Sequence, residues 1–397
     1  MIYTAHPVWM HPPTWGEQII ERLDWKTDVL SGELGTEQRV ARRLTPRRSF
    51  TASFYLQKTD RQQFEYNMAA RGSQVWVIPV WHDVSTLDAD AASGASVLSV
   101  DTQYREFLNS GLVVLRGQSL NSWEVGIVQS KTSSSITLTD TLSAAWPKRT
   151  KVYPARLARL VFTLETAKKT DDFVEARIGF TLDQRNPYVS DIAFPTYLSS
   201  PVLEQRPDES DELSFGYERL LSIVDNDVGL PSYLDTANKT FQTIGYRWSV
   251  IGRQKAHDLR QLLSYLRGRA RAMWIPTFMQ DFTLDSDVAN GATTLAVKNV
   301  GYTDSGARAA GKQDIRIQLA DGTVLYRRIT ASIVSSATRE TLTLSSPIAT
   351  GFVVGQVVAI SHMQLSRMES DSLELRHPTD SAGVTQCDAR WRGPTNF

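Results

Sequence analysis

Residues 78–100 of the chain recur at 275–297 without a gap, and this duplication constrains the fold more than any other feature of the sequence. The first segment reads IPVWHDVSTLDADAASGASVLSV, the second reads IPTFMQDFTLDSDVANGATTLAV, and eleven of the 23 aligned positions are identical. The same offset of 197 relates Glu21-Arg22-Leu23 to Glu218-Arg219-Leu220, so the register extends well beyond these segments. A repeat of this length predicts two homologous halves, each the size of one or two domains.

Each half is predicted to contain an alternating strand, one helix and a second strand, in that order. Apolar and polar residues alternate from Phe50 to Leu56, which is the period of a half-buried strand. A helix is expected over 59–71, ended by Gly72, and QVWVIPV at 74–80 is the next strand. The second half repeats this order with alternation over 244–250, a leucine-faced helix over 256–269 and the strand AMWIP.

Short β runs separated by Gly, Ser, Asp and Asn follow in each half, which is typical of a small barrel or sandwich. Each half is therefore expected to be an outer domain of strands and one helix, interrupted by an inserted β module. The predicted fold class is mainly β, or α+β. The predicted boundaries are 1–16 for an N-terminal arm, 17–87 plus 158–186 for the first outer domain, 88–157 for the first inserted module, 187–213 for a linker, 214–284 plus 366–397 for the second outer domain, and 285–365 for the second inserted module.

Composition excludes several classes of protein. The 43 basic and 43 acidic residues cancel, so no net charge favours nucleic acid or an anionic membrane. No apolar run is long enough to span a bilayer, and the N-terminus lacks a secretory signal, so synthesis in a cytoplasm without membrane insertion is expected. The single cysteine, Cys387, excludes an internal disulfide framework and is expected to be a buried strand residue.

The sequence contains no recognisable catalytic, cofactor or metal motif. The six histidines have no ligand spacing, and no nucleophile elbow, phosphate loop or dinucleotide fingerprint occurs. We therefore expect no catalytic residue, cofactor or metal. Asp88 and Asp90 recur in the second half as Asp285 and Asp287. Such a pair would suit a glycosidase or a divalent ion. The favoured interpretation is that these aspartates cap a turn where the chain enters the inserted module. The duplicated junction positions are Pro79, Asp88, Asp90 and Gly94, with Pro276, Asp285, Asp287 and Gly291.

Two groups of residues are candidates for an assembly interface. A basic cluster suits either phosphate binding or an intersubunit contact with the acidic run at 208–212, and the intersubunit contact is favoured because Lys239 is its one counterpart in the second half. Tryptophans before the first domain are expected to pack on a neighbouring subunit, because aromatic residues are enriched at protein interfaces. The candidates are Trp9, Trp15, Trp25, Arg42, Arg43, Arg47 and Arg48.

The run WGEQIIERLDWKTDVLSGELGTEQRVARRLTPRRSFTASFYL at 15–56, followed by a helix and VWVIPVW, resembles distal tail and baseplate hub proteins of long-tailed, siphovirus-like bacteriophages. The resemblance implies a split β-barrel with one helix, forming a ring at the tail tip. It also implies a non-enzymatic virion protein that contacts the tail tube, hub or fibre proteins and the tape-measure protein, around a channel for DNA. With two barrels in this chain, three copies would form a pseudo-sixfold ring, and six copies would place the barrels in stacked or concentric rings.

Two other functions remain open from the residues. A carbohydrate-binding protein would use exposed aromatic residues in both inserted modules, yet Trp81 aligns with Phe278 and Trp123 has no clear counterpart. A hydrolase of cell-wall glycans would require two carboxylates with separated pKa values in one cleft.

Overall fold

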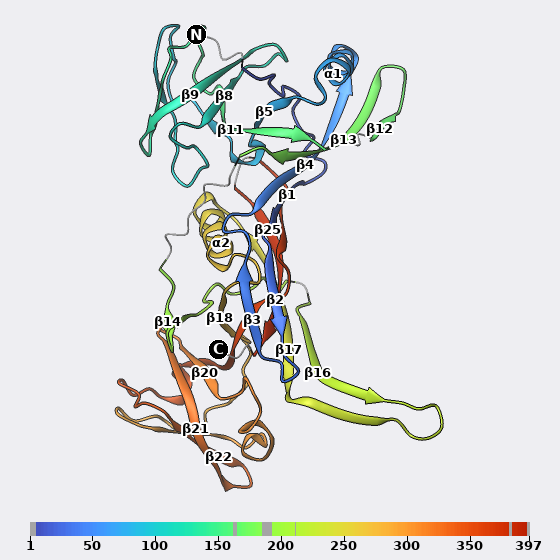
Figure 1. Cartoon of the computed structure of the whole chain (residues 1–397). Coiled ribbons are helices and arrows are strands. Elements are labelled where there is room, and N and C mark those ends of the chain that lie inside the picture. The colour runs from blue at the N-terminus through green and yellow to red at the C-terminus, as the bar shows by residue number, and fades with distance from the viewer. Residues whose placement is uncertain (1–4, 162–164, 185–192, 211, 381–382, 395–397) are drawn as a thin grey trace.

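The computed structural model describes residues 5–161, 165–184, 193–210, 212–380 and 383–394. The protein is mainly β, with 49% strand and 10% helix, and most of its strands join in one large antiparallel sheet. Figure 1 shows an elongated molecule with the first half at one end, the inserted module of the second half at the other, and a long hairpin that projects sideways. The predicted fold class is confirmed at this level.

The first half contains one long helix, a 3₁₀ turn and thirteen strands among the described residues. The strand β4 pairs with β13, which also pairs with β11, and β11 pairs in turn with β5 and β8. The elements are β1 (Ile19–Asp24), β2 (Thr27–Ser31), β3 (Glu37–Ala41), β4 (Arg47–Gln57), α1 (Lys58–Arg71), β5 (Val75–Pro79), η1 (Trp81–Asp83), β6 (Ser85–Thr86), β7 (Val97–Ser99), β8 (Leu112–Arg116), β9 (Trp123–Lys131), β10 (Ser135–Leu138), β11 (Lys151–Leu160), β12 (Glu165–Lys168) and β13 (Phe173–Leu182).

The second half follows a short hairpin of β14 (Thr196–Tyr197) and β15 (Ser200–Pro201). Here β17 pairs with β25, which also pairs with β23, and β23 pairs with β18 and β20. The elements are β16 (Ser214–Val224), β17 (Ser232–Val250), α2 (Arg253–Leu266), β18 (Ala272–Pro276), β19 (Thr294–Lys298), the π-helical turn η2 (Tyr302–Gly306), β20 (Asp314–Leu319), β21 (Val324–Ser336), β22 (Arg339–Leu344), η3 (Val354–Gln356), β23 (Val357–Met368), β24 (Ser372–His377) and β25 (Thr385–Gly393).

The predicted apolar patterns are buried where the sequence places them. The alternating apolar residues of β4 and of the last part of β17 are buried, as are the leucines of α2. Cys387 is buried in β25, as expected. The buried apolar residues form four large clusters, two in each half, and the first of them combines residues of β4, β5 and β13 with residues of β8, β9 and β11. Burial of these side chains is the main favourable contribution to the free energy of folding.

The two halves are joined by the N-terminal part of the first half. The strand β1 pairs with β4 on one side and with β24 of the second half on the other. Trp25, which follows β1, lies in the hydrophobic core of the second half, and Figure 1 shows the hairpin β2–β3 alongside that half. The sequence places 17–87 in the first domain alone, whereas β1 and the hairpin β2–β3 also contact the second half, through the pairing of β1 with β24, the burial of Leu23 and Trp25, and the ion pair of Glu37 with Arg367.

The linker predicted at 187–213 also contacts the second half. Val202 forms a parallel bridge with Trp274, and Leu203 is buried in the second core. Glu204 accepts hydrogen bonds from Arg316 and Tyr326. Within the described part of this segment, the chain is therefore tied to the domain that follows it.

Candidate functional site

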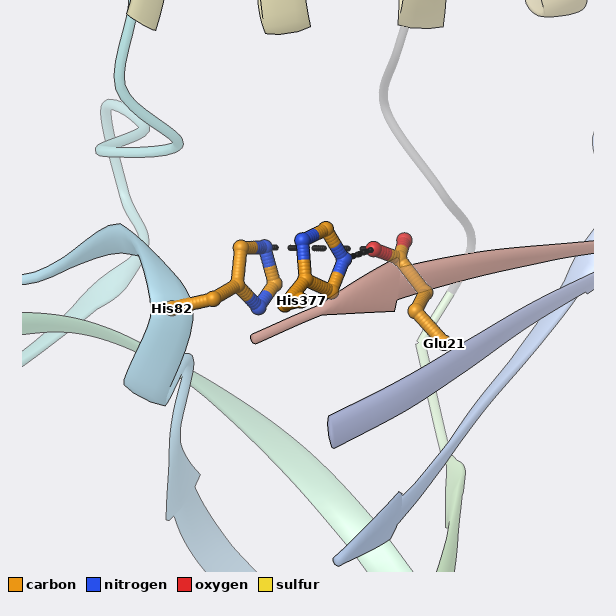
Figure 2. Close-up of side chains that lie close together, drawn as sticks. All are labelled: Glu21, His82 and His377. Atoms are coloured by element: carbon orange, nitrogen blue, oxygen red, sulfur yellow. Dashed lines mark hydrogen bonds and ion pairs between the residues drawn. The ribbon is translucent and has the colours of Figure 1, made fainter. Parts of the chain in front are cut away.

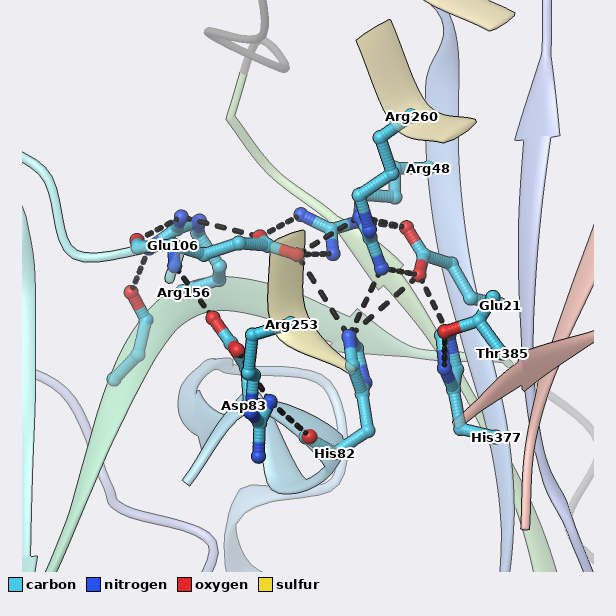
Figure 3. A network of polar contacts seen from close by, with 11 residues as sticks. Glu21, Arg48, His82, Asp83, Glu106, Arg156, Arg253, Arg260, His377 and Thr385 are labelled. Atoms are coloured by element: carbon cyan, nitrogen blue, oxygen red, sulfur yellow. Dashed lines mark hydrogen bonds and ion pairs between the residues drawn. The ribbon is translucent and has the colours of Figure 1, made fainter. Parts of the chain in front are cut away.

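A network of buried charged side chains lies where the two halves meet. Figure 3 shows the network between β1, β4, η1 and β11 of the first half and α2 and β24 of the second. Its labelled residues are Glu21, Arg48, His82, Asp83, Glu106, Arg156, Arg253, Arg260, His377 and Thr385. Because buried charges are costly unless they are paired, the pairing within this network decides whether the junction is stable.

Glu21 is the acceptor at the centre of the network. Its Oε1 accepts hydrogen bonds from Arg48 Nε at 2.6 Å and from Arg260 Nη1 at 3.0 Å. Its Oε2 accepts from Arg260 Nη2 and from His377 Nε2. Burial alone would raise the pKa of Glu21, but the charges of Arg260 and Arg48 outweigh burial and hold this pKa well below its usual range.

Glu106, in the loop between β7 and β8, is the second buried acceptor. Arg48 donates to both of its carboxylate oxygens, at 2.5 and 2.6 Å, and Arg260 Nη1 lies 2.8 Å from Oε1. Burial would raise the pKa of Glu106, yet Arg48 and Arg260 lower it well below its usual range. The two arginines therefore bridge the two carboxylates, and since Arg260 belongs to α2, the bridge crosses between the halves.

Asp83 and Arg253 extend the network from η1 to the first turn of α2. Arg253 Nη1 donates to Asp83 Oδ1 at 2.6 Å and to the carbonyl oxygen of His82 at 2.7 Å. Asp83 in turn accepts from the backbone N–H of Glu106. Burial and the nearby Glu106 raise the pKa of Asp83 to about 6, although Arg253 opposes this shift.

Two histidines stack face to face inside the network, as Figure 2 shows. The rings of His82 and His377 have centroids 3.7 Å apart and planes 5° apart. His377 donates Nε2–H to Glu21 at 3.0 Å, so its Nδ1 accepts from the hydroxyl of Thr385. His82 Nε2 accepts from Arg260, because a guanidinium can only donate. Burial lowers the pKa of both rings and so favours their neutral form, in which each ring has one donor and one acceptor nitrogen.

Glu21, His82 and His377 form the one metal-type group among the described residues, with ligand atoms within 4.8 Å of one another. The donor set does not fit a cation, because both oxygens of Glu21 and the Nε2 of His82 already accept from arginine. A divalent ion here would also lie beside two guanidinium groups, whose positive charges repel it.

The network leaves no room for a substrate. The cavity bordered by His82, Glu106, Arg260 and His377 has a volume of about 20 Å³, which is room for about one water molecule. The described residues of the network tie the two halves together through paired charges. We therefore treat the junction as a structural clamp.

The predicted interface residues separate into two groups. Trp9 is buried in the core of the first half, Trp25 in the core of the second, and Arg48 in the network, so a partner protein has no access to these three side chains. Their burial follows from contacts within the chain that the sequence does not reveal. Trp15, Arg42, Arg43 and Arg47 are exposed or half-buried and stay candidates for an interface.

The duplicated junction positions have matching roles. Asp90 Oδ1 accepts from the backbone N–H of Lys148, 58 residues later, and Asp287 Oδ1 accepts from that of Val354, 67 residues later, so both bonds are long-range contacts. Asp88 is exposed, and Asp285 forms an ion pair with Arg339. Gly94 and Gly291 have φ of +85° and +76°, where a side chain is strained. Pro79 and Pro276 are the last residues of β5 and β18.

Sequence reasoning missed most of the clamp. Of its members, only Arg48 belongs to a predicted site. Glu21 lies in a segment whose duplication is visible in the sequence, but nothing near Glu106, Arg260 or His377 marks them as partners. Up to 356 residues separate the members that touch, so no local pattern could bring them together.

No protein-family model matches the sequence, and no curated protein is significantly similar to it. Among the described residues, neither helix combines the length and the apolar character needed to cross a bilayer.

Proposed function

We propose that the chain is a structural, non-enzymatic protein of a phage virion that forms a ring at the distal end of the tail. In this proposal the ring joins the tail tube to the hub and receptor-binding fibres, meets the tape-measure protein, and leaves a channel for DNA. The two halves are tandem copies of one split β-barrel with a helix, each carrying an inserted β module. The protein is made in the host cytoplasm and resides at the tail tip.

Equivalent pairings in the two halves support the duplication. Pro79 pairs with Ala155 in the first half, and its duplicate Pro276 pairs with Met363 in the second. The N–H of Gly94 donates to Leu142, and that of Gly291 donates to Ile348. Helices α1 and α2 each lie between the corresponding long strand and short strand. The duplicated positions thus have the same neighbours in both halves.

The strand β1 carries the proposal, because it joins one half to the next by completing the sheet of its neighbour. It pairs with the edge strand β24 of the second half. In the second half, the duplicate of β1 is β16. In the first half, the counterpart of β24 is β12, because β12 lies beside β13 as β24 lies beside β25. Among the described residues, β16 pairs with β17 alone and β12 pairs with β13 alone. Both therefore have an edge that is open to a second copy of the chain.

Salt bridges at the docked hairpin β2–β3 point to the same contact between copies. Glu37 of this hairpin accepts from both Arg367 Nε and Nη2 at 2.6 Å. In the second half, Arg367 pairs across the sheet with Ala272. In the first half, Arg159 pairs in the same way with Val75, which is the duplicate of Ala272. Arg159 is therefore the counterpart of Arg367. The side chain of Arg159 is 55% exposed and is bound to Asp183 at the surface. It is thus placed to meet the hairpin of a neighbouring copy.

The hairpin of the second half is long and apolar, as expected of a segment that docks on another copy. Figure 1 shows the tip of β16–β17 projecting from the body of the molecule. Leu230 at the tip is 99% exposed, and Val228, Tyr233 and Leu234 are exposed as well. Exposed apolar groups of this extent mark interaction surfaces. Docking β16 of each chain on β12 of the next is a head-to-tail contact, which closes into a ring if the rotation permits.

Native mass spectrometry of the purified chain, with electron microscopy of the same sample, tests this proposal. We expect closed trimers, or hexamers, with a central hole. The double variant Leu230→Asp with Leu234→Asp should be monomeric, whereas Ile333→Asp, at an exposed position of the second inserted module, should assemble like the wild type. A wild-type chain that stays monomeric at high concentration would refute the ring.

A further inference from the structure

A cleft of about 930 Å³ lies between the N-terminal segment, the first outer domain and the first inserted module. Its volume is within the range of small-molecule sites, roughly 300 to 1,000 Å³. Aromatic side chains from separate parts of the chain converge on it. Trp15 and Trp123 are half-buried, whereas Trp81, Trp146 and Tyr153 are buried, with 2%, 6% and 4% of their surface exposed.

The rings of this cleft are held in place before any ligand arrives. Trp146 donates Nε1–H to the buried Glu124 at 2.9 Å. Trp81 packs against Phe54 and Phe180 at ring-centroid distances of 5.8 and 5.5 Å. Trp15 and Trp123 are half-buried and pack against the first core. Such preorganisation lowers the entropic cost of binding.

The cleft is also basic. Arg116, Lys148, Arg149 and Lys151 line it, and Asp380 is the one acidic side chain among its described lining residues. Asp380 is paired with Lys151 at 2.9 Å, so three cations are left without an acidic partner from the lining. A positive potential over aromatic faces favours an anionic ligand with apolar ring faces.

The equivalent position in the second half is occupied by the chain itself. Phe278 is the duplicate of Trp81, and the guanidinium groups of Arg316 and Arg206 lie over its ring at 5.4 and 5.9 Å. Glu204 of the linker holds Arg316 in this place by accepting hydrogen bonds from its Nε and Nη2. In the second half, side chains of the linker and of β20 therefore cover the ring that corresponds to Trp81.

We propose that this cleft binds an acidic saccharide, one that carries carboxylate, sulfate or phosphate groups. The accessible parts of Trp15 and Trp123 would pack against the apolar faces of the sugar rings, the cations would bind the acidic groups, and Asn121 and Gln118 would bind hydroxyls. Single-stranded nucleic acid also combines stacking with cations, but its sites extend over about 4 to 16 nucleotides. A cleft of about 930 Å³ has the volume of a small-molecule site, which favours a short saccharide over such a strand.

Calorimetric titration of the full chain with a heparin tetrasaccharide, trigalacturonate and the uncharged maltotriose tests the inference. At least one acidic saccharide should bind saturably, and maltotriose should bind at least tenfold more weakly. Trp123→Ala should weaken binding roughly tenfold. Arg149→Gln should weaken it several-fold and flatten its dependence on salt. Tyr66→Ala and Lys298→Gln, at exposed positions outside the cleft, should bind as the wild type does.

Thermal melts of each variant establish that it is folded, and Trp123→Phe should restore part of the affinity. Failure of both acidic saccharides to bind would overturn the inference, as would equal binding of maltotriose or unchanged binding by folded Trp123→Ala. A thymidine oligonucleotide that binds through Trp123, while no saccharide does, would assign the cleft to nucleic acid instead. The titration does not depend on oligomeric state, so its outcome is distinct from that of the ring proposal.

Discussion

Replacing Glu21 with Gln removes one negative charge from the buried clamp while the shape of the side chain is kept. The side chains of Glu21 and Arg48 are at most 1% exposed, and that of Arg260 is 8% exposed. Without the carboxylate, two guanidinium groups and the Nε2–H of His377 lose their shared acceptor, and the new amide group cannot accept at both of its ends. Breaking a buried ion pair by removing one partner costs about 3–5 kcal/mol. We expect Glu21→Gln to destabilise the junction by this amount.

The matched control is Glu218→Gln, because Glu218 is the duplicate of Glu21. Its side chain is 56% exposed and pairs with Arg392 at 3.2 Å, so the loss should be about 0–1 kcal/mol. A protein of several domains need not unfold in one step, so hydrogen exchange of the amides in β1 and β24 is measured together with urea unfolding. Exchange in β1 and β24 should accelerate in Glu21→Gln and not in the control. A change below about 1 kcal/mol in Glu21→Gln would refute the clamp as a determinant of stability.

Three other outcomes are expected. The free energy of unfolding should fall as pH is lowered below about 6.5. Burial lowers the pKa of the folded histidines, so the unfolded chain binds more protons than the folded chain in this range. Urea midpoints at pH 7.5 and 5.5 measure the effect, and equal midpoints would contradict it. The buried histidines with a lowered pKa are His11, His82, His362 and His377. Trp9→Ala should lower the free energy of unfolding in urea by about 3–5 kcal/mol. The indole ring contacts four other aromatic side chains and a histidine. An unchanged urea midpoint would show that the core collapses around the gap. Cys387 should resist a thiol reagent at pH 8 until the protein unfolds, since burial raises the pKa of its thiol to about 12, and rapid labelling of the native chain would contradict this.

The parts of the fold that could be predicted are those encoded by local patterns. The alternation at Phe50 to Leu56 and the leucines of α2 each reflect which face of one element is apolar, and burial follows directly from that periodicity. The duplication marks Asp90 and Asp287 as a related pair, but their partners, Lys148 and Val354, lie 58 and 67 residues away and follow from no local pattern. The interface prediction for Trp9 and Arg48 shows what residue type alone does not decide. An aromatic residue such as Trp9 occurs both in cores and at surfaces, and a basic residue such as Arg48 occurs both at surfaces and in buried ion pairs.

The sequence by itself determined the β-rich class, the presence of both helices and the buried strands, because these depend on residues close together in the chain; α2 begins and ends three residues before the predicted 256–269. The tertiary structure alone decided that β1 completes the sheet of the second half, that Glu21 meets Arg260 and His377, and that aromatic rings converge on one cleft in the first half. Those contacts join residues far apart in sequence, and their stability depends on the geometry of charges and rings that only the folded chain brings together.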